Sequence, residues 1–335
     1  MHDLLQREMS LSLFGIFTFW AVVMLVIVLG FVTYAIYFER KILGWMQSRI
    51  GPNRVGPLGL LQTVADILKL LMKEDTIPRK ADRPFFILAP IIVYVPSFAV
   101  IATIPFAENL YNANLNVGIL YYAALSSIST IGIVLGGWAS NNKYALLGGM
   151  RSAAQMISYE IPLVISVVGI VMMSGSLNLH TIVSQQTGGF WNWNFLPQIV
   201  GFAVFIVAAI SELNRTPFDL PEAESELVAG YHVEYSGFRF AFFMLAEYVY
   251  VFALSALATV LFLGGWDAPL PFLDFIPGIF WFILKFAFFV FFLIWIRGTL
   301  PRVRIDQLMG LGWKVLLPLA LVNIIITAVY MEIVK

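Results

Sequence analysis

The first long stretch of the chain carries no charge: residues 11–38 are 28 uncharged and mostly apolar residues. At about 1.5 Å per residue, a helix of this length exceeds the roughly 30 Å apolar core of a bilayer. The run is too long for a signal peptide and has no small-x-small cleavage site. Charged residues make up only 12% of the chain, against about 25% in soluble domains. A polytopic membrane protein is therefore predicted.

Eight segments are predicted to cross the membrane, all as helices, because backbone polar groups in lipid must be satisfied within the segment. The expected spans are 11–38, 85–106, 117–139, 153–173, 195–213, 240–263, 275–296 and 315–332. The predicted fold class is thus an all-α polytopic membrane protein, with residues 1–335 forming a single integral membrane domain.

The basic residues predict the orientation of these spans. Seventeen of the 20 Lys and Arg lie in the connections after the first, third, fifth and seventh spans, which all face the same side of the membrane. The loops on the opposite side, 107–116, 174–194 and 264–274, contain none. The positive-inside rule places the basic side in the cytoplasm or its equivalent and both termini outside.

The first inner connection contains an amphipathic segment. A Gly- and Pro-rich chain of turns, residues 49–59, leads into residues 58–73, where Gln62, Asp66, Lys69 and Lys73 form one polar stripe at helical spacing. The segment is too short and too charged to span, so a helix along the inner interface is expected.

Three glutamates are expected in the inner half of the bilayer: Glu160, Glu212 and Glu247. Intramembrane acids typically mark proton or ion paths, and the alternative is a structural pair with Arg or a hydroxyl. Pro162, close to Glu160, predicts a broken helix beside a polar cavity. Lys285 is expected to snorkel toward the outer surface.

The inner loop 214–239 is acidic. Glu222 and Glu226 are four residues apart and would share one helical face, while Glu224 would point elsewhere. Apolar residues, Phe218 among them, favour a folded segment that lines a wet, negatively charged cavity over a solvated loop. No third ligand is spaced for a metal at Glu222 and Glu226. The chain has no Cys, which excludes thiolate-ligated zinc, iron–sulfur clusters and disulfides within it.

Four stretches resemble one family, the quinone-site membrane subunit of respiratory complex I, which is the H subunit of the bacterial complex and its mitochondrial counterpart. They are ERKILGWMQSRIGPNRVGPLGLLQTVADILKLLMKE (39–74), SYEIP around Glu160, SELNRTPFDLPEAESELVAGYHVEYSGFRFAFFMLAEY (211–248) and PRVRIDQLMGLGWK (301–314). The resemblance covers nearly the whole chain, and it implies a subunit of a proton-translocating NADH:quinone oxidoreductase.

The resemblance also implies roles for particular residues. The proton path would comprise Glu160, Glu212, Asp219, Glu222, Glu224, Glu226 and Glu247. The entrance and lower wall of the quinone chamber would comprise Arg40, Arg49, Asp66, Arg215, Phe218 and Arg302. Quinone would be a substrate, with no covalently bound cofactor and no metal in this chain, and flavin and iron–sulfur clusters would belong to partner subunits.

The implied partners are the soluble quinone-site and iron–sulfur subunits, small membrane subunits, antiporter-like subunits, quinone and the lipid bilayer, with no nucleic acid. The expected location is the bacterial inner membrane, with a mitochondrial or plastid membrane as the alternative. Two other functions remain open from the sequence: a freestanding proton or ion transporter, and the related membrane subunit of a membrane-bound hydrogenase.

Overall fold

Helices account for nearly all regular structure in the computed structural model, which describes residues 11–220 and 228–334 and has no strand element within them. Seven helices of this described part are long and apolar enough to cross a membrane: Phe14–Met46, Arg83–Thr103, Gly118–Ala139, Lys143–Ser174, Gly237–Phe262, Gly278–Thr299 and Ile305–Ile333. The predicted all-α polytopic class is confirmed. The expected span 195–213 coincides with a helix of only 14 residues, α8 (Ile199–Glu212), so the count of eight stays a prediction.

The chain divides into two compact units, the first ending at Met72 and the second beginning at Lys73. The first unit contains α2 (Leu11–Met46), the short helix η1 (Pro57–Gly59) and α3 (Gln62–Met72). Gly59 adopts a φ of 82°, and a Cβ there would lie 2.3 Å from the carbonyl oxygen of Pro52. Because this tight turn needs glycine, the amphipathic helix begins at Gln62, later than expected.

Within this unit, Asp66 of the predicted polar stripe faces α2, and Gln62 lies beside it. Arg40 of α2 donates from Nη1 to Asp66 Oδ2 at 2.5 Å, and Gln62 donates to the other carboxylate oxygen of Asp66 at 3.2 Å. Leu68, Leu71 and Met72 are exposed. An exposed apolar face suits a helix lying on a membrane surface, and this placement stays a prediction.

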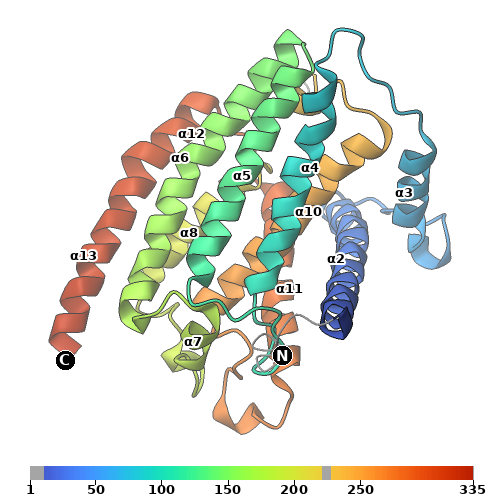
Figure 1. Ribbon diagram of the computed structural model, residues 1–335. Helices are drawn as coiled ribbons and strands as arrows, with labels where there is room; N and C mark the ends of the chain where they lie inside the picture. Colours follow the sequence, from blue (N-terminus) through green and yellow to red (C-terminus); the bar gives the residue numbers. More distant parts are fainter. Residues whose placement is uncertain (1–10, 221–227, 335) are drawn as a thin grey trace. The chain divides into compact units, whose positions relative to one another are not determined.

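The second unit is a bundle whose helices run between two ends (Figure 1). It contains α4 (Arg83–Val100), α5 (Gly118–Ala139), α6 (Lys143–Ser174), α7 (Leu179–Ser184), α8, α10 (Gly237–Phe262), α11 (Gly278–Thr299), α12 (Ile305–Leu311) and α13 (Leu317–Val334). From Val249 to Phe262, α10 is buried throughout, so it forms the core of the bundle.

Hydrogen bonds between connections define the two ends. At one end the pairs are Asn141–Lys80 (3.0 Å), Asp82–Ala139 (3.0 Å), Asn142–Glu234 (2.7 Å) and Val303–Pro217 (3.0 Å). At the other end they are Asn178–Asn114 (2.5 Å), His180–Glu108 (3.0 Å) and Phe190–Pro269 (2.9 Å). The connections of this unit that carry Lys and Arg thus lie at one end, and the loops without Lys or Arg lie at the other. This separation is expected when basic loops stay on one side of a membrane. Which end faces the cytoplasm stays a prediction.

The part of the acidic loop that the structure describes is folded. Tyr235 stacks on Phe86 of α4 with ring centroids 4.0 Å apart and donates a hydrogen bond to the Phe86 carbonyl oxygen. His232 is also buried, and burial lowers its pKa to about 4. This end of the loop is therefore packed against the bundle.

The prediction of a broken helix at Pro162 is wrong. The Asn142 side chain caps α6 by accepting from Tyr144 N, and the helix then continues through Pro162 to Gly175, where the backbone turns left-handed. Buried membrane helices tolerate proline because neighbouring groups compensate for the lost hydrogen bond.

Lys285, which was expected to snorkel toward the outer surface, binds a specific set of carbonyl groups instead. Its ammonium group donates to the carbonyl oxygens of Leu263, Gly265 and Asp267 at 2.6, 3.1 and 2.7 Å. It also lies 4.0 Å from the ring centroid of Trp193. Lys285 therefore stabilises the C-terminal end of α10, through the carbonyl oxygen of its capping residue Leu263, together with the loop that follows it.

Candidate functional site

The predicted site residues fall in different parts of the structure. Arg40, Arg49 and Asp66 belong to the first unit. The second unit holds Glu160, Glu212, Arg215, Phe218, Asp219, Glu247 and Arg302. Glu222, Glu224 and Glu226 lie outside the described residues.

In the second unit, the segment after α8 is fixed to the bundle by Gln155 of α6. The Gln155 amide nitrogen donates to the carbonyl oxygens of Ser211 and Phe218, each at 2.8 Å. Phe218 is buried, with its ring centroid 6.0 Å from that of Tyr159. Consequently the segment that carries Arg215 and Asp219 has a defined position beside α6.

Arg215 pairs with Glu247 of α10. The Nε to Oε1 distance is 2.6 Å, and only 6% of the arginine side chain is exposed. The Arg215 guanidinium also lies 4.2 Å from the ring centroid of Tyr248. A charge buried to this degree requires a close partner, so the pair places Glu247 at the start of the loop.

Glu212, the last residue of α8, is 7% exposed, and its Oε2 has no hydrogen-bond partner among the described residues. Its polar neighbours include Glu160 of α6 and the hydroxyl of Ser126 of α5. Glu160 in turn accepts a hydrogen bond from Ser127 of α5. Two predicted intramembrane acids are therefore neighbours on different helices.

A small cavity connects Glu212 with Glu247. It encloses about 30 Å³, and its lining includes these two carboxyls together with Ser129, Asn214 and Tyr250. A cavity needs roughly 10–15 Å³ to hold one water, and a water needs two to four polar partners. This cavity meets both conditions, so water can link the two acids.

Asp219 and Arg302 form a second ion pair, with 3.2 Å between Oδ2 and Nη2. Burial raises the pKa of the Asp219 carboxyl, and the nearby guanidinium groups of Arg302 and Arg297 oppose that rise. The backbone next to Arg302 is joined to the same loop, because Val303 N donates to the Pro217 carbonyl oxygen at 3.0 Å.

In the first unit, Arg40 pairs with Asp66 at 2.5 Å, and Arg49 donates to the side-chain oxygen of Gln47 at 2.6 Å. In the second unit, the structure therefore brings together one cluster and an adjoining ion pair. The cluster comprises Glu160, Glu212, Arg215 and Glu247, and the ion pair joins Asp219 of the loop to Arg302 of the connection between α11 and α12. Arg40 and Asp66 form a separate pair within their own unit.

Sequence reasoning missed the hydroxyl groups around the acids. Ser126, Ser127 and Ser129 come from α5, which is apolar overall, and Tyr250 comes from α10. A signal for Tyr250 was present, since it follows Glu247 by three residues and therefore shares its helical face.

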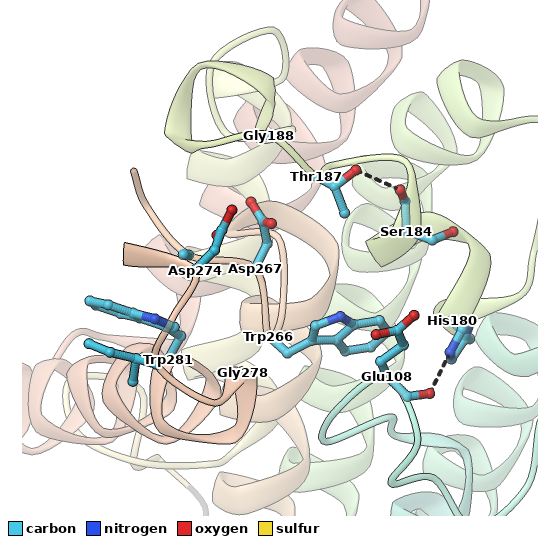
Figure 2. A pocket seen from close by; sticks show the side chains of 12 residues that line it. Glu108, His180, Ser184, Thr187, Gly188, Trp266, Asp267, Asp274, Gly278 and Trp281 are labelled. Carbon is cyan, nitrogen blue, oxygen red and sulfur yellow. Dashed lines mark hydrogen bonds between the residues drawn. The ribbon is translucent and has the colours of Figure 1, made fainter. Parts of the chain in front are cut away.

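A larger cavity of about 410 Å³ lies at the opposite end of the second unit (Figure 2). The side chains in view include the acids Glu108, Asp267 and Asp274 and the indoles of Trp266 and Trp281. It contains none of the predicted site residues, and the part of the chain that the structure describes has no group of three His, Asp or Glu able to hold a metal ion. The candidate site is therefore the glutamate cluster.

Comparison with known proteins gives one consistent family. The family model described as NADH dehydrogenase matches residues 19–328. The chain is 65% identical to the NADH-quinone oxidoreductase H subunit of Brevibacillus brevis, over 98% of this chain and 97% of that protein. It is also 65% identical to the protein of that name from Anoxybacillus flavithermus and 64% identical to that from Bacillus thuringiensis, over 98% of each chain.

These matches confirm the resemblance that the sequence motifs indicated, and they favour neither the transporter nor the hydrogenase alternative. Combined with the seven apolar helices of spanning length in the described residues, they identify a multi-pass membrane protein. The chain belongs to the NADH dehydrogenase family, and its bacterial relatives in that family are H subunits of NADH-quinone oxidoreductase, a membrane subunit of complex I.

Proposed function

We propose that this chain couples quinone reduction to proton translocation through Glu160, Glu212 and Glu247. One observation carries the proposal: Glu212 of α8 and Glu247 of α10 line the same water-sized cavity, and Glu160 is a neighbour of Glu212. Carboxyl groups that interact this closely exchange protons as a coupled set, because a change in one charge alters the proton affinity of the others.

The ion pairs of the loop can transmit a change of charge, such as the one that accompanies quinone reduction, to the glutamate cluster. Arg215 of the loop holds Glu247, and Asp219 of the same loop is held by Arg302 from the connection between α11 and α12. A charge that appears beside either guanidinium would compete for it and weaken the ion pair. A loosened Arg215 would leave Glu247 without its counter-ion, which favours proton uptake by Glu247.

For the quinone, we propose a chamber whose entrance and lower wall include Arg40, Arg49 and Asp66 of the first unit. For Arg215, Phe218 and Arg302 of the second unit, we likewise propose a role in quinone binding. Asp219 and the three glutamates Glu222, Glu224 and Glu226 are proposed to belong to the proton path. Quinone is the substrate, and this chain, which has no Cys, would leave the electron transfer to iron–sulfur and flavin subunits.

The partners proposed are the soluble quinone-site and iron–sulfur subunits, the small membrane subunits and the antiporter-like subunits. The bacterial inner membrane is the proposed location, since the relatives named above are bacterial. The proposed activity of the assembly is that of a proton-translocating NADH:quinone oxidoreductase, a translocase.

The test is the double substitution Glu212→Gln/Glu247→Gln in an assembled complex reconstituted into vesicles. Glutamine keeps nearly the same shape and removes the ionisation, so quinone-linked turnover and proton pumping should fall together. Glu108→Gln, an exposed acid at the opposite end of the second unit, is the matched control and should have no effect. Full rates with an unchanged proton-to-electron ratio in the double variant would rule the proposal out.

The quinone part has a separate test, Arg49→Ala, with Arg54→Ala in the same loop as control. Arg49 offers directional donors that lysine does not reproduce. Quinone reduction should weaken in the Arg49 variant, while flavin-site activity with artificial acceptors persists. Unchanged quinone kinetics in an assembled complex would show that Arg49 is only a surface charge.

A further inference from the structure

Tyr250 lies where the three glutamates of the proposed proton path come together. It is 8% exposed, and it lines the cavity that Glu212 and Glu247 share. Its hydroxyl is also within electrostatic range of both Glu212 and Glu160. Tyr250 therefore lines the space between Glu212 and Glu247 and also interacts electrostatically with Glu160.

The hydroxyl of Tyr250 is oriented by α5. It donates to the carbonyl oxygen of Leu125 at 3.5 Å and also forms a hydrogen bond with Ser129. Because Ser129 donates its own proton to the Ser126 carbonyl oxygen at 2.7 Å, Ser129 too is an acceptor, and the one proton of Tyr250 is shared between Leu125 and Ser129. The lone pairs of the tyrosine oxygen are left for a donor in the cavity.

A second tyrosine, Tyr122 of α5, extends this arrangement. It is 2% exposed, and its hydroxyl has no hydrogen-bond partner among the described residues. Its polar neighbours are Glu212 and Tyr250. A buried hydroxyl without a partner indicates an ordered water or an exchanging proton at that position.

We propose that Tyr250 is a positioning residue of the proton path, whose hydroxyl, supported by that of Tyr122, orients water in the cavity that Glu212 and Glu247 share. This inference rests on the proposed function. The step moves one proton through that water from the Glu212 carboxyl to the Glu247 carboxylate, or in reverse. Any hydroxyl that joins the transfer releases one proton as it receives another, so both tyrosines end neutral.

The experiment compares Tyr250→Phe with Tyr235→Phe in the assembled complex in vesicles. Both tyrosines are buried to a similar degree, 8% and 6% exposed, and each hydroxyl has a backbone carbonyl oxygen as partner. Only Tyr250 interacts with the glutamates, since the charged neighbour of Tyr235 is Arg239. Comparing the two variants therefore distinguishes the effect of removing any buried hydroxyl from the effect of disrupting the water between the glutamates.

Quinone-linked turnover, the proton-to-electron ratio and the rate ratio between H₂O and D₂O are measured for each variant. Tyr250→Phe should lower turnover by about tenfold, the loss expected when one neutral hydrogen bond is removed. It should also increase the D₂O effect, because proton transfer becomes rate-limiting, and a purely structural change would not do so. Tyr235→Phe should leave the D₂O effect at the parent value.

A Tyr250→Phe complex with parental turnover and D₂O effect would overturn the inference. If Glu212→Gln abolishes pumping in the same assay, the proposed function survives that result, and if Glu212→Gln is also silent, both fail. Should Tyr250→Phe fail to assemble, Ser129→Ala removes the side-chain acceptor of Tyr250, keeps the ring and leaves only the 3.5 Å contact with the Leu125 carbonyl oxygen to orient the hydroxyl. The same loss of turnover with an increased D₂O effect is then expected, and its absence overturns the inference.

Discussion

At the scale of single residues, the Arg215–Glu247 pair should be essential for stability. Arg215→Ala leaves the Glu247 carboxylate, 20% exposed, without its 2.6 Å partner. Removing one member of a buried pair typically costs about 3–5 kcal/mol, whereas neutralising both costs much less. Thermal unfolding of the purified complex should therefore show a large loss for Arg215→Ala and a partial recovery in Arg215→Ala/Glu247→Gln. Equal stability of the single and double variants would show that the pair is not coupled.

His232 should make the stability of the loop depend on pH. Burial lowers its pKa in the folded state to about 4, against an ordinary value of 6.5. The unfolded state therefore binds the proton more readily, so the contribution of His232 to stability is fully present above about pH 6.5 and is lost as the pH falls toward 4. The loss amounts to about 3 kcal/mol at most.

His232→Gln tests this dependence. The thermal midpoints of variant and parent are compared from pH 8 to pH 5, since the packing cost of the substitution is the same at every pH. The deficit of the variant at pH 8 should shrink as the pH falls. A deficit that stays constant would mean that His232 does not titrate as stated.

Sequence predicted which acids lie among apolar residues, and the structure places Glu160 and Glu212 next to each other on separate helices. The sequence did not predict that Arg215 would pair with Glu247, 32 positions away, because tertiary packing determines which side chains meet. For the same reason the hydroxyls of Tyr122 and Tyr250 escaped notice, since an isolated tyrosine in an apolar helix resembles a core residue.

At the scale of elements, the turn before α3 should depend on Gly59. A Cβ there would lie 2.3 Å from the Pro52 carbonyl oxygen, and the φ of 82° disfavours any L side chain. Gly59→Ala should therefore displace α3 and lower the thermal stability of the complex by more than about 1–2 kcal/mol. Gly30→Ala in α2, where no atom lies within 4 Å of the added methyl group, is the control and should be tolerated. Equal stabilities would show that the turn adapts to a side chain.

Periodicity and composition predicted the presence of the long helices but not all of their ends and contacts. Apolar runs predicted seven of the spanning helices, but α6 begins at Lys143, well before the expected residue 153, because Asn142 caps it. Apolar content alone does not reveal such caps. In the case of Pro162, propensity predicted a break that the packed environment of α6 suppresses. Lys285 likewise found three carbonyl partners that only the folded loop provides.

At the scale of the whole molecule, the distribution of charge agrees with the arrangement of the second unit. The loops around Glu108, His180 and Asp267 meet at one end and contain no Lys or Arg. The connections around Lys80 and Arg302 meet at the other. Two ends of opposite character follow from the sorting of basic loops to one side of a membrane.

This distribution predicts the topology, and labelling can test it because the chain has no Cys of its own. Thr187→Cys and Lys80→Cys place exposed thiols at the two ends. In intact cells, an impermeant maleimide should label Thr187→Cys, because that end is predicted to face outward, and should not label Lys80→Cys. After the membrane is made permeable, both should react, which controls for accessibility. Labelling of Lys80→Cys alone in intact cells would reverse the predicted orientation, and with it the side from which the glutamate cluster takes up protons.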